Sequence, residues 1–328
     1  MWKSISSEVQ GRGHIKSGIP CQDKTLACLR NGVSIIALAD GAGSAKYSHF
    51  GAECVVASAS HFIADNFTTL IENPDGVQVK LLILENIIAS LTNIAIEYEC
   101  TLKDLASTLL LVAIFEERFI IIHIGDGVIG YLNGTELKVA SFPDNGESSN
   151  ITTFVTSKEA LPSMRLFKGN VKDISGFILM SDGTGESLYH KSTETLVHGI
   201  IRIMHRNCLI NAQTMKAQLH HTLESLISKN THDDCSIAVL SRSYGILRPY
   251  ENLTFLEKCD LLNIKSTKGS KKRITWYNAA LQSLASPKTI MQLSHEFHLK
   301  KKYIKKRVKA LAHSGLIESD GVLYYRSE

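Results

Sequence analysis

The sequence predicts an α+β fold in which antiparallel sheets form the centre and paired helices lie on the outside. Three observations support this class. Several apolar runs of strand length are joined by turns too short for a crossover, so neighbouring strands must be antiparallel. Two pairs of segments carry apolar residues at helical spacing, one after Gly51 and one after residue 191. A chain of 328 residues exceeds a typical single domain, which predicts a second, smaller domain.

The first predicted element is a hairpin with acidic residues at its open end. Asp23 precedes a short apolar strand, and a turn at Asn31-Gly32 leads into the apolar run from Ile35 to Ala39, which stops at Asp40-Gly41. Two amphipathic helices should follow, one from Gly51 to about Asn66 and one from about Val77 to Tyr98.

A meander of strands comes next. The segment from Asp104 to Thr108 begins a strand that continues as TLLLVAIF, and a tight turn at Glu116-Glu117 joins it to RFIIIHIGD. VIGYL and a short strand near Glu136 to Ala140 extend the meander. Residues 142–164 are polar and turn-rich, which favours a substrate-facing flap. The strand GFILM, helices near 192–206 and 212–229, and the closing strand SIAVL complete this part.

Acidic residues recur at the predicted strand ends. Asp40, Asp126 and Asp182 each follow an apolar run and precede a glycine, while Asp233-Asp234 stand immediately before SIAVL. One Asp-Gly alone is usually an ordinary turn, but strands of alternating direction would bring these four acidic loops to one sheet edge. Clustered carboxylates raise one another's pKa unless cations neutralise them. Oxygen ligands suit hard ions such as magnesium or manganese.

Composition restricts the class of protein. A hydrophobic content of 44% with 21% charged residues is typical of a soluble globular protein. No apolar run approaches the roughly 18 residues of a membrane span and no apolar signal core opens the chain, so we expect a cytoplasmic protein without a membrane partner. The seven cysteines form no CxxC pair, which favours reduced thiols. The chain also lacks the CxxxxxR, HExxH and GxxxxGK[ST] motifs of three other catalytic designs.

The acidic motifs carry a family resemblance. In order along the chain they read QDK, ALADGAGS, LASTLLLVAI, IGDG, LMSDGTGESL and HDDCSIAVL. Over roughly residues 10 to 241 this set resembles the metal-dependent protein phosphatase 2C family, specifically a bacterial subgroup. The resemblance implies an αββα sandwich that hydrolyses phosphoserine and phosphothreonine esters of proteins with two manganese or magnesium ions.

The same resemblance assigns roles to residues. It implies that Asp40, Asp182 and Asp233 are the catalytic metal ligands, with Asp40 bridging both ions and Gly41 offering its carbonyl oxygen to one of them. Asp23 would hold the second ion, and Asp126 a weaker third ion. Asp234 stands where the family commonly has Asn, so we expect it to support the ligands from behind.

One departure concerns the phosphate. Many relatives place an Arg five residues before the aspartate that corresponds to Asp23, and Gly18 occupies that position. His14 and Lys16 are the candidates to bind phosphate instead, with a solvated role as the alternative.

The end of the chain differs in charge. Residues 262–328 contain 14 Lys and Arg against 4 Asp and Glu, whereas residues 1–261 contain 22 against 28. We predict a phosphatase-like domain over 1–243, a linker over 244–272 and a winged helix-turn-helix-like domain over 273–328. In its third helix Ile304, Val308 and Leu311 should be buried. This leaves a lysine face exposed to bind DNA or a protein partner: Lys301, Lys302, Lys305, Lys306 and Lys309.

Two functions compete. The first is a protein serine/threonine phosphatase whose substrate is a phosphorylated protein, with a cognate kinase or its targets suggested by family habit. The second is a catalytically weak phosphatase-like regulator that acts through its basic domain. The acidic residues at 23, 40, 182 and 233 favour the first, because a binding module has no need of mutually repelling carboxylates.

Overall fold

The computed structural model describes residues 1–144, 152–242, 250–314, 316–319 and 321–326. Contacts between Cα atoms divide the chain into two compact units. The larger unit comprises residues 2–204 and 216–242, and the smaller unit comprises Met1, residues 205–215 and residues 243–328.

Two five-stranded sheets form the centre of the larger unit, and every pairing within them is antiparallel. The first sheet has the order β2 (Lys24–Arg30), β3 (Val33–Ala39), β4 (Leu109–Phe115), β5 (Arg118–Ile124) and β8 (Arg165–Asn170). The second has the order β1 (Trp2–Val9), β12 (Cys235–Arg242), β9 (Ile174–Met180), β6 (Val128–Asn133) and β7 (Glu136–Ser141). The predicted α+β class with antiparallel sheets is confirmed.

Strand β3 explains the layering. Its seven residues are all buried. Ile35 and Ala37 belong to a core shared with helices, whereas the alternating Ile36 and Leu38 belong to a core between the two sheets. A strand between a helical layer and a second sheet needs apolar residues on both faces, and this is why the run is continuous.

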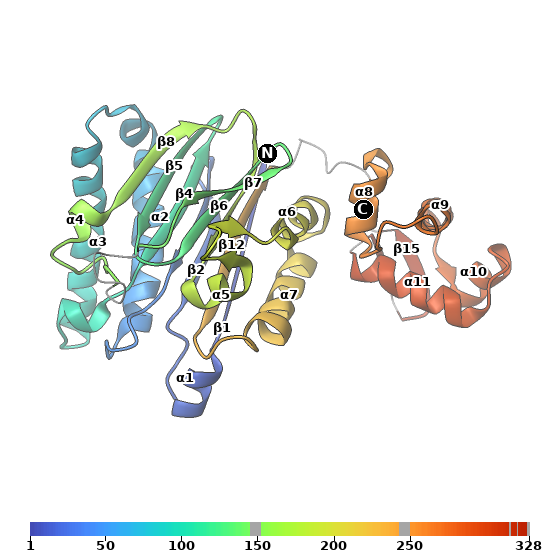
Figure 1. Cartoon of the computed structure of the whole chain (residues 1–328), viewed down its shortest axis with the longest axis horizontal. Coiled ribbons are helices and arrows are strands. Elements are labelled where there is room, and N and C mark those ends of the chain that lie inside the picture. The colour runs from blue at the N-terminus through green and yellow to red at the C-terminus, as the bar shows by residue number, and fades with distance from the viewer. Residues whose placement is uncertain (145–151, 243–249, 315, 320, 327–328) are drawn as a thin grey trace. The chain divides into compact units, whose positions relative to one another are not determined.

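Helices α2 (Ser48–Glu72) and α3 (Gly76–Glu97) cover the outer face of the first sheet (Figure 1). The α2 helix extends beyond the predicted end near residue 66 because Phe67, Leu70 and Ile71 remain in the core. Where a strand is predicted from residue 104, the chain forms the 3-10 helix η1 (Leu102–Leu105), which a capping box between Thr101 and Asp104 begins.

Several of the remaining elements of the larger unit flank the second sheet, whereas α4 (Ala160–Ser163) contacts α3 on the side of the first sheet. Ser7 of β1 bonds to His220 of α7, and a side chain at Gly176 of β9 would touch Met204 of α6. The predicted helix over 192–206 begins only at residue 199, because residues 189–196 form a small hairpin. The elements are α1 (Arg12–Ser17), α4 (Ala160–Ser163), α5 (Asp182–Leu188), β10 (Tyr189–His190), β11 (Thr195–Leu196), α6 (Gly199–Leu209), α7 (Ala212–Thr222) and the π-helix η2 (Leu223–Ile227).

By length and composition alone, α3 could cross a membrane. It passes this test because Lys80 and Glu85 are the only charged residues between Gly76 and Ile96. Val79, Ile83, Ile87 and Leu91 recur every fourth residue and are fully buried in the core beneath the helix. This spacing is that of a helix packed on one face.

The smaller unit contains a three-stranded antiparallel sheet of order β13 (Lys288–Thr289), β15 (Leu323–Arg326) and β14 (Ile317–Ser319). Its helical elements are η3 (Tyr250–Asn252), α8 (Phe255–Leu261), α9 (Ser270–Ser283), α10 (Ile290–Glu296) and α11 (Lys301–His313). The predicted linker over 244–272 is therefore wrong in part. A capping box between Thr254 and Glu257 begins α8, and Cys259 and Leu261 of that helix are buried. Residues 243–249 lie outside the described residues.

Helix α11 divides into two faces. Ile304, Val308 and Leu311 are buried as predicted, and the guanidinium of Arg307 lies 4.6 Å from the centre of the Trp276 ring. The five predicted lysines of this helix are exposed on the other face. The helix thus exposes five positive charges on one face, while its opposite face is packed in the core of the smaller unit.

Candidate active site

The predicted acidic residues meet at one edge of the two sheets. Register aligns the strand ends within each sheet: Lys24 pairs with Ala39 and Leu109 with Ile124 in the first, and Ile237 with Met180 in the second. These pairs bring together the start of β2, the end of β3, the end of β5, the end of β9 and the start of β12. The acidic side chains that the structure brings to this edge are Asp23, Asp40, Asp126, Asp182 and Asp233.

Burial and mutual repulsion dominate the electrostatics there. Burial raises the pKa of Asp40 well above its usual range, and the negative charges of the other four acids raise it further. Burial is also the main cause that raises the pKa of Asp23 to about 8 and the pKa of Asp182 to about 6. A cation at this edge would remove most of the repulsion.

Asp23 gives the most direct indication of a cation. Asp23 is 1% exposed, and neither carboxylate oxygen has a hydrogen-bond partner at normal geometry; the nearby Ser236 and Ser181 hydroxyls lower its pKa but do not offset the effect of burial. A buried, unpaired carboxylate is costly, and a hard metal ion satisfies both of its oxygens. Within the described residues, no three His, Cys, Asp or Glu side chains already converge on one metal position. The all-oxygen donor set nevertheless fits manganese or magnesium.

The Asp40-Gly41 turn is held by neighbouring backbone. The Asp40 N–H donates to Thr108 Oγ1 at 2.9 Å, and the Thr108 N–H donates to the Asp40 carbonyl oxygen at 2.8 Å. The Gly41 N–H donates to the carbonyl oxygen of Gln22 at 3.2 Å. A Cβ on Gly41 would lie 2.8 Å from Cβ of Ser48, so only glycine fits this turn.

Asp234 holds the segment that carries Asp23. Its two carboxylate oxygens accept hydrogen bonds from the N–H groups of Gly11 and Gln22, each at 2.6 Å. Asp233 Oδ1 in turn accepts the N–H of Asp234 at 2.8 Å. Since Gln22 precedes Asp23, Asp234 fixes the backbone on which that ligand candidate stands.

The candidate phosphate-binding residues lie on or near α1. His14 Nδ1 is 2.9 Å from Asp234 Oδ1, while Lys16 is exposed to solvent. Arg12 donates twice to the carbonyl oxygen of Thr231, and Gly18 ends α1 in the left-handed region with φ 68°. The phosphate-binding role of His14 and Lys16 therefore stays a prediction.

Three residues support the acids through hydrogen bonds that the sequence did not predict: Gln22, Thr108 and Thr152. The Thr152 hydroxyl donates to Asp126 Oδ2 at 2.6 Å. Each acts on a residue remote in the chain or through its backbone, so no local pattern marks it. Of the predicted flap, residues 142–144 and 152–164 are described, whereas residues 145–151 lie outside the described residues.

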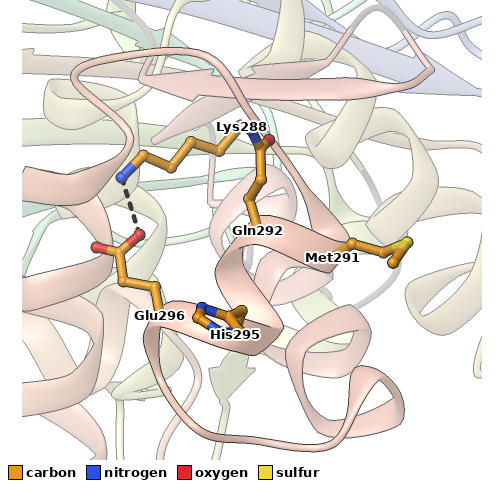
Figure 2. A pocket seen from close by; sticks show the side chains of 5 residues that line it. All are labelled: Lys288, Met291, Gln292, His295 and Glu296. Atoms are coloured by element: carbon orange, nitrogen blue, oxygen red, sulfur yellow. Dashed lines mark hydrogen bonds and ion pairs between the residues drawn. The ribbon is translucent and has the colours of Figure 1, made fainter.

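A hollow of about 480 Å³ in the smaller unit is a different feature (Figure 2). Lys288, Met291, Gln292, His295 and Glu296 line it, and Lys288 Nζ lies 2.8 Å from Glu296 Oε2. Among the described residues, Glu296 is the one acidic residue that lines this hollow, and Lys288 neutralises it. Its described lining therefore lacks the clustered carboxylates of the sheet edge.

Comparison with known proteins gives the class. The family model "Protein phosphatase 2C" matches residues 10–224, more than half of the chain, and the chain belongs to this family. The match ends before the helices of the residue 250–328 segment.

Individual relatives agree with this class. Serine/threonine-protein phosphatase 3 of Escherichia coli (strain K12) is 26% identical over 180 residues, which are 51% of this chain and 67% of that protein. A bacterial serine phosphatase structure shares the fold with a TM-score of 0.53 at 18% identity, covering 75% of this chain and all of that one. Stp1 from Staphylococcus aureus has a TM-score of 0.53 at 18% identity, with coverages of 74% and 96%. The predicted enzyme class, a protein-serine/threonine phosphatase, is confirmed.

Proposed function

We propose that the larger unit hydrolyses phosphoserine and phosphothreonine esters of proteins with two manganese or magnesium ions. Asp40, Asp182, Asp233 and the Gly41 carbonyl oxygen would hold these ions together with Asp23, and Asp126 would hold a weaker third ion. The observation that carries the proposal is the meeting of five acids at one edge, with Asp23 buried among them. Family membership supports the choice of ions.

Held by these residues, the two ions would supply a water activated for attack on phosphorus. The chain's own residues supply rigidity. Thr108 and Gln22 fix the Asp40-Gly41 turn, and Asp234 fixes the backbone before Asp23. These bonds hold the carboxylates close despite their repulsion, so the ligand set is preorganised. No side-chain nucleophile is required.

The test is a phosphatase assay of the purified full chain on a panel of phosphopeptides with manganese or magnesium. Asp40→Asn and Asp182→Asn should each lower activity to background, because each keeps the shape of the side chain but removes a negative charge from the ligand set. Asp173→Asn changes an exposed aspartate in the same way and should leave activity unchanged. Full activity with a chelator, or near-normal turnover in the Asp40 variant, would disprove the mechanism. Inactivity of the parent on every substrate would favour the phosphatase-like regulator.

We also propose that residues 270–328 form a winged helix-turn-helix that binds duplex DNA. Support comes from the order helix, short strand, two helices and a strand pair, and from the exposed lysines of α11. Retention of duplex DNA by the full chain at low salt tests this role. Absence of retention would make a protein partner the preferred ligand of this surface. A cytoplasmic location is likewise proposed, and cell fractionation tests it.

A further inference from the structure

The described ends of the flap contact the Asp126 loop in two places. The Thr152 hydroxyl donates to Asp126 Oδ2 at 2.6 Å. On the other side, the Asp144 N–H donates to the carbonyl oxygen of Gly125 at 3.1 Å. One contact is therefore made by the backbone and the other by a side chain that touches the carboxylate itself.

The backbone beneath Asp126 is fixed independently of Thr152. Buried His123 bonds through Nε2 to the Gly125 carbonyl oxygen at 2.9 Å and through Nδ1 to Ser141 Oγ at 2.7 Å. Gly125 has φ 113°, and a Cβ there would lie 2.5 Å from Thr108 Cγ2. The main chain has little freedom, so rotation of the side chain decides where the Asp126 carboxylate points.

We propose that Thr152 is the positioning residue that orients the Asp126 carboxylate toward the third cation position. This inference rests on the proposed function. The Thr152 hydroxyl fixes Oδ2 and so the plane of the carboxylate, which orients Oδ1 for a cation. Hydrogen bonds to ligating carboxylates fix their orientation, and loss of such a partner typically costs about 10- to 100-fold in metal affinity.

Four substitutions test this role, and the first two separate the effect of the hydroxyl from the effect of side-chain size. Thr152→Val keeps the shape and removes the hydroxyl, whereas Thr152→Ser keeps the hydroxyl and removes a methyl group. Thr153→Val makes the same chemical change one residue further along, where the structure gives no hydrogen bond for the side chain. Asp126→Ala removes the carboxylate itself.

Manganese binding to the full chain is measured by titration, with electron paramagnetic resonance reporting the concentration of free Mn²⁺. In the parent we expect a tight class of two ions and a weak class of one. Thr152→Val should weaken the weak class about 10- to 100-fold and leave the tight class unchanged. Thr152→Ser and Thr153→Val should bind like the parent, and Asp126→Ala should lose the weak class.

An unchanged weak class in Thr152→Val would overturn the inference. So would an equal weakening of both classes, or the same loss in Thr153→Val, because each would indicate general damage to the fold. A parent that binds no manganese at all would instead overturn the proposed function, so the two failures are distinguishable.

Discussion

At the scale of single residues, the buried acids Asp23 and Asp182 destabilise the folded larger unit when they are ionised. The folded state raises the pKa of Asp23 to about 8 and that of Asp182 to about 6, from the usual value of 3.8. The folded protein thus holds these protons more tightly than the unfolded chain does. The stability from this source is fully present below about pH 4 and is lost as pH rises toward 8.

The melting temperature of the ion-free protein should therefore fall between pH 5 and pH 8 in the presence of a chelator. Asp23→Asn should flatten this decline because it removes the group with the larger shift of the two, and Asp173→Asn should not. Added manganese should restore stability at pH 8, since an ion bound only to the folded state stabilises it. Thermal scans in matched buffers measure all three effects. A melting temperature that rises with pH in chelator would contradict the electrostatic account.

At the scale of elements, α2 and η1 pack without room for a side chain. A Cβ on Gly51 of α2 would lie 2.0 Å from the carbonyl oxygen of Leu105. Gly51→Ala should therefore cost about 1–3 kcal/mol, because backbone must move. Gly76→Ala, at the start of α3, meets only Leu166 at 3.8 Å, and should be neutral or stabilise by up to about 1 kcal/mol.

Tryptophan fluorescence can report on the larger unit alone. The chain has two tryptophans, and Trp2 packs against Phe177 while Trp276 belongs to the smaller unit. In a Trp276→Phe background, urea unfolding followed through Trp2 measures both glycine variants. Equal urea midpoints for Gly51→Ala and its parent would contradict this prediction, because they would show that η1 moves aside with no loss in the free energy of unfolding.

Elements with a strong pattern of their own were predictable, and the others depend on partners. The buried strand β3 and helix α3 carry uninterrupted apolar periodicity, and their predicted positions agree with the structure. Strand β1 reads WKSISSEV and β8 reads RLFKGN, and neither has an apolar run that marks it. They are strands because they pair with β12 and β5. The acids were predictable because each stands at one end of an apolar strand, whereas the hydrogen bonds of Gln22 and Thr152 join residues remote in the chain and required the structure.

At the scale of the whole molecule, the two units allow independent tests. If the lysine face of α11 neutralises DNA phosphates, log affinity should fall with log salt by about 0.9 per phosphate contacted. Four to six contacts would give a slope of roughly −4 to −5. Changing Lys301, Lys305 and Lys306 to Glu should weaken binding progressively, as measured by fluorescence anisotropy over a salt series.

Lys191→Glu in the larger unit serves as the charge control, because it is exposed and far from α11 in sequence. Hydrolysis of a small aryl phosphate should be unchanged in all of these variants, since the acids belong to the other unit. A salt slope near zero, or equal weakening by Lys191→Glu, would contradict specific use of the α11 face.

The pairing of β1 with β12 has a consequence for the order of synthesis. Val9 and Cys235 are partners although more than 220 residues separate them. Ribosomes add about 5–20 residues per second, so roughly 10 to 45 s pass between the synthesis of β1 and that of its partner β12. Asp233 and Asp234 emerge just before β12, so the proposed ligand set and the hydrogen bond from the Gln22 N–H to Asp234 are completed late in synthesis. If these residues form the active site as proposed, a nascent chain is inactive until its second sheet closes, and until then its open strand edges are exposed to aggregation.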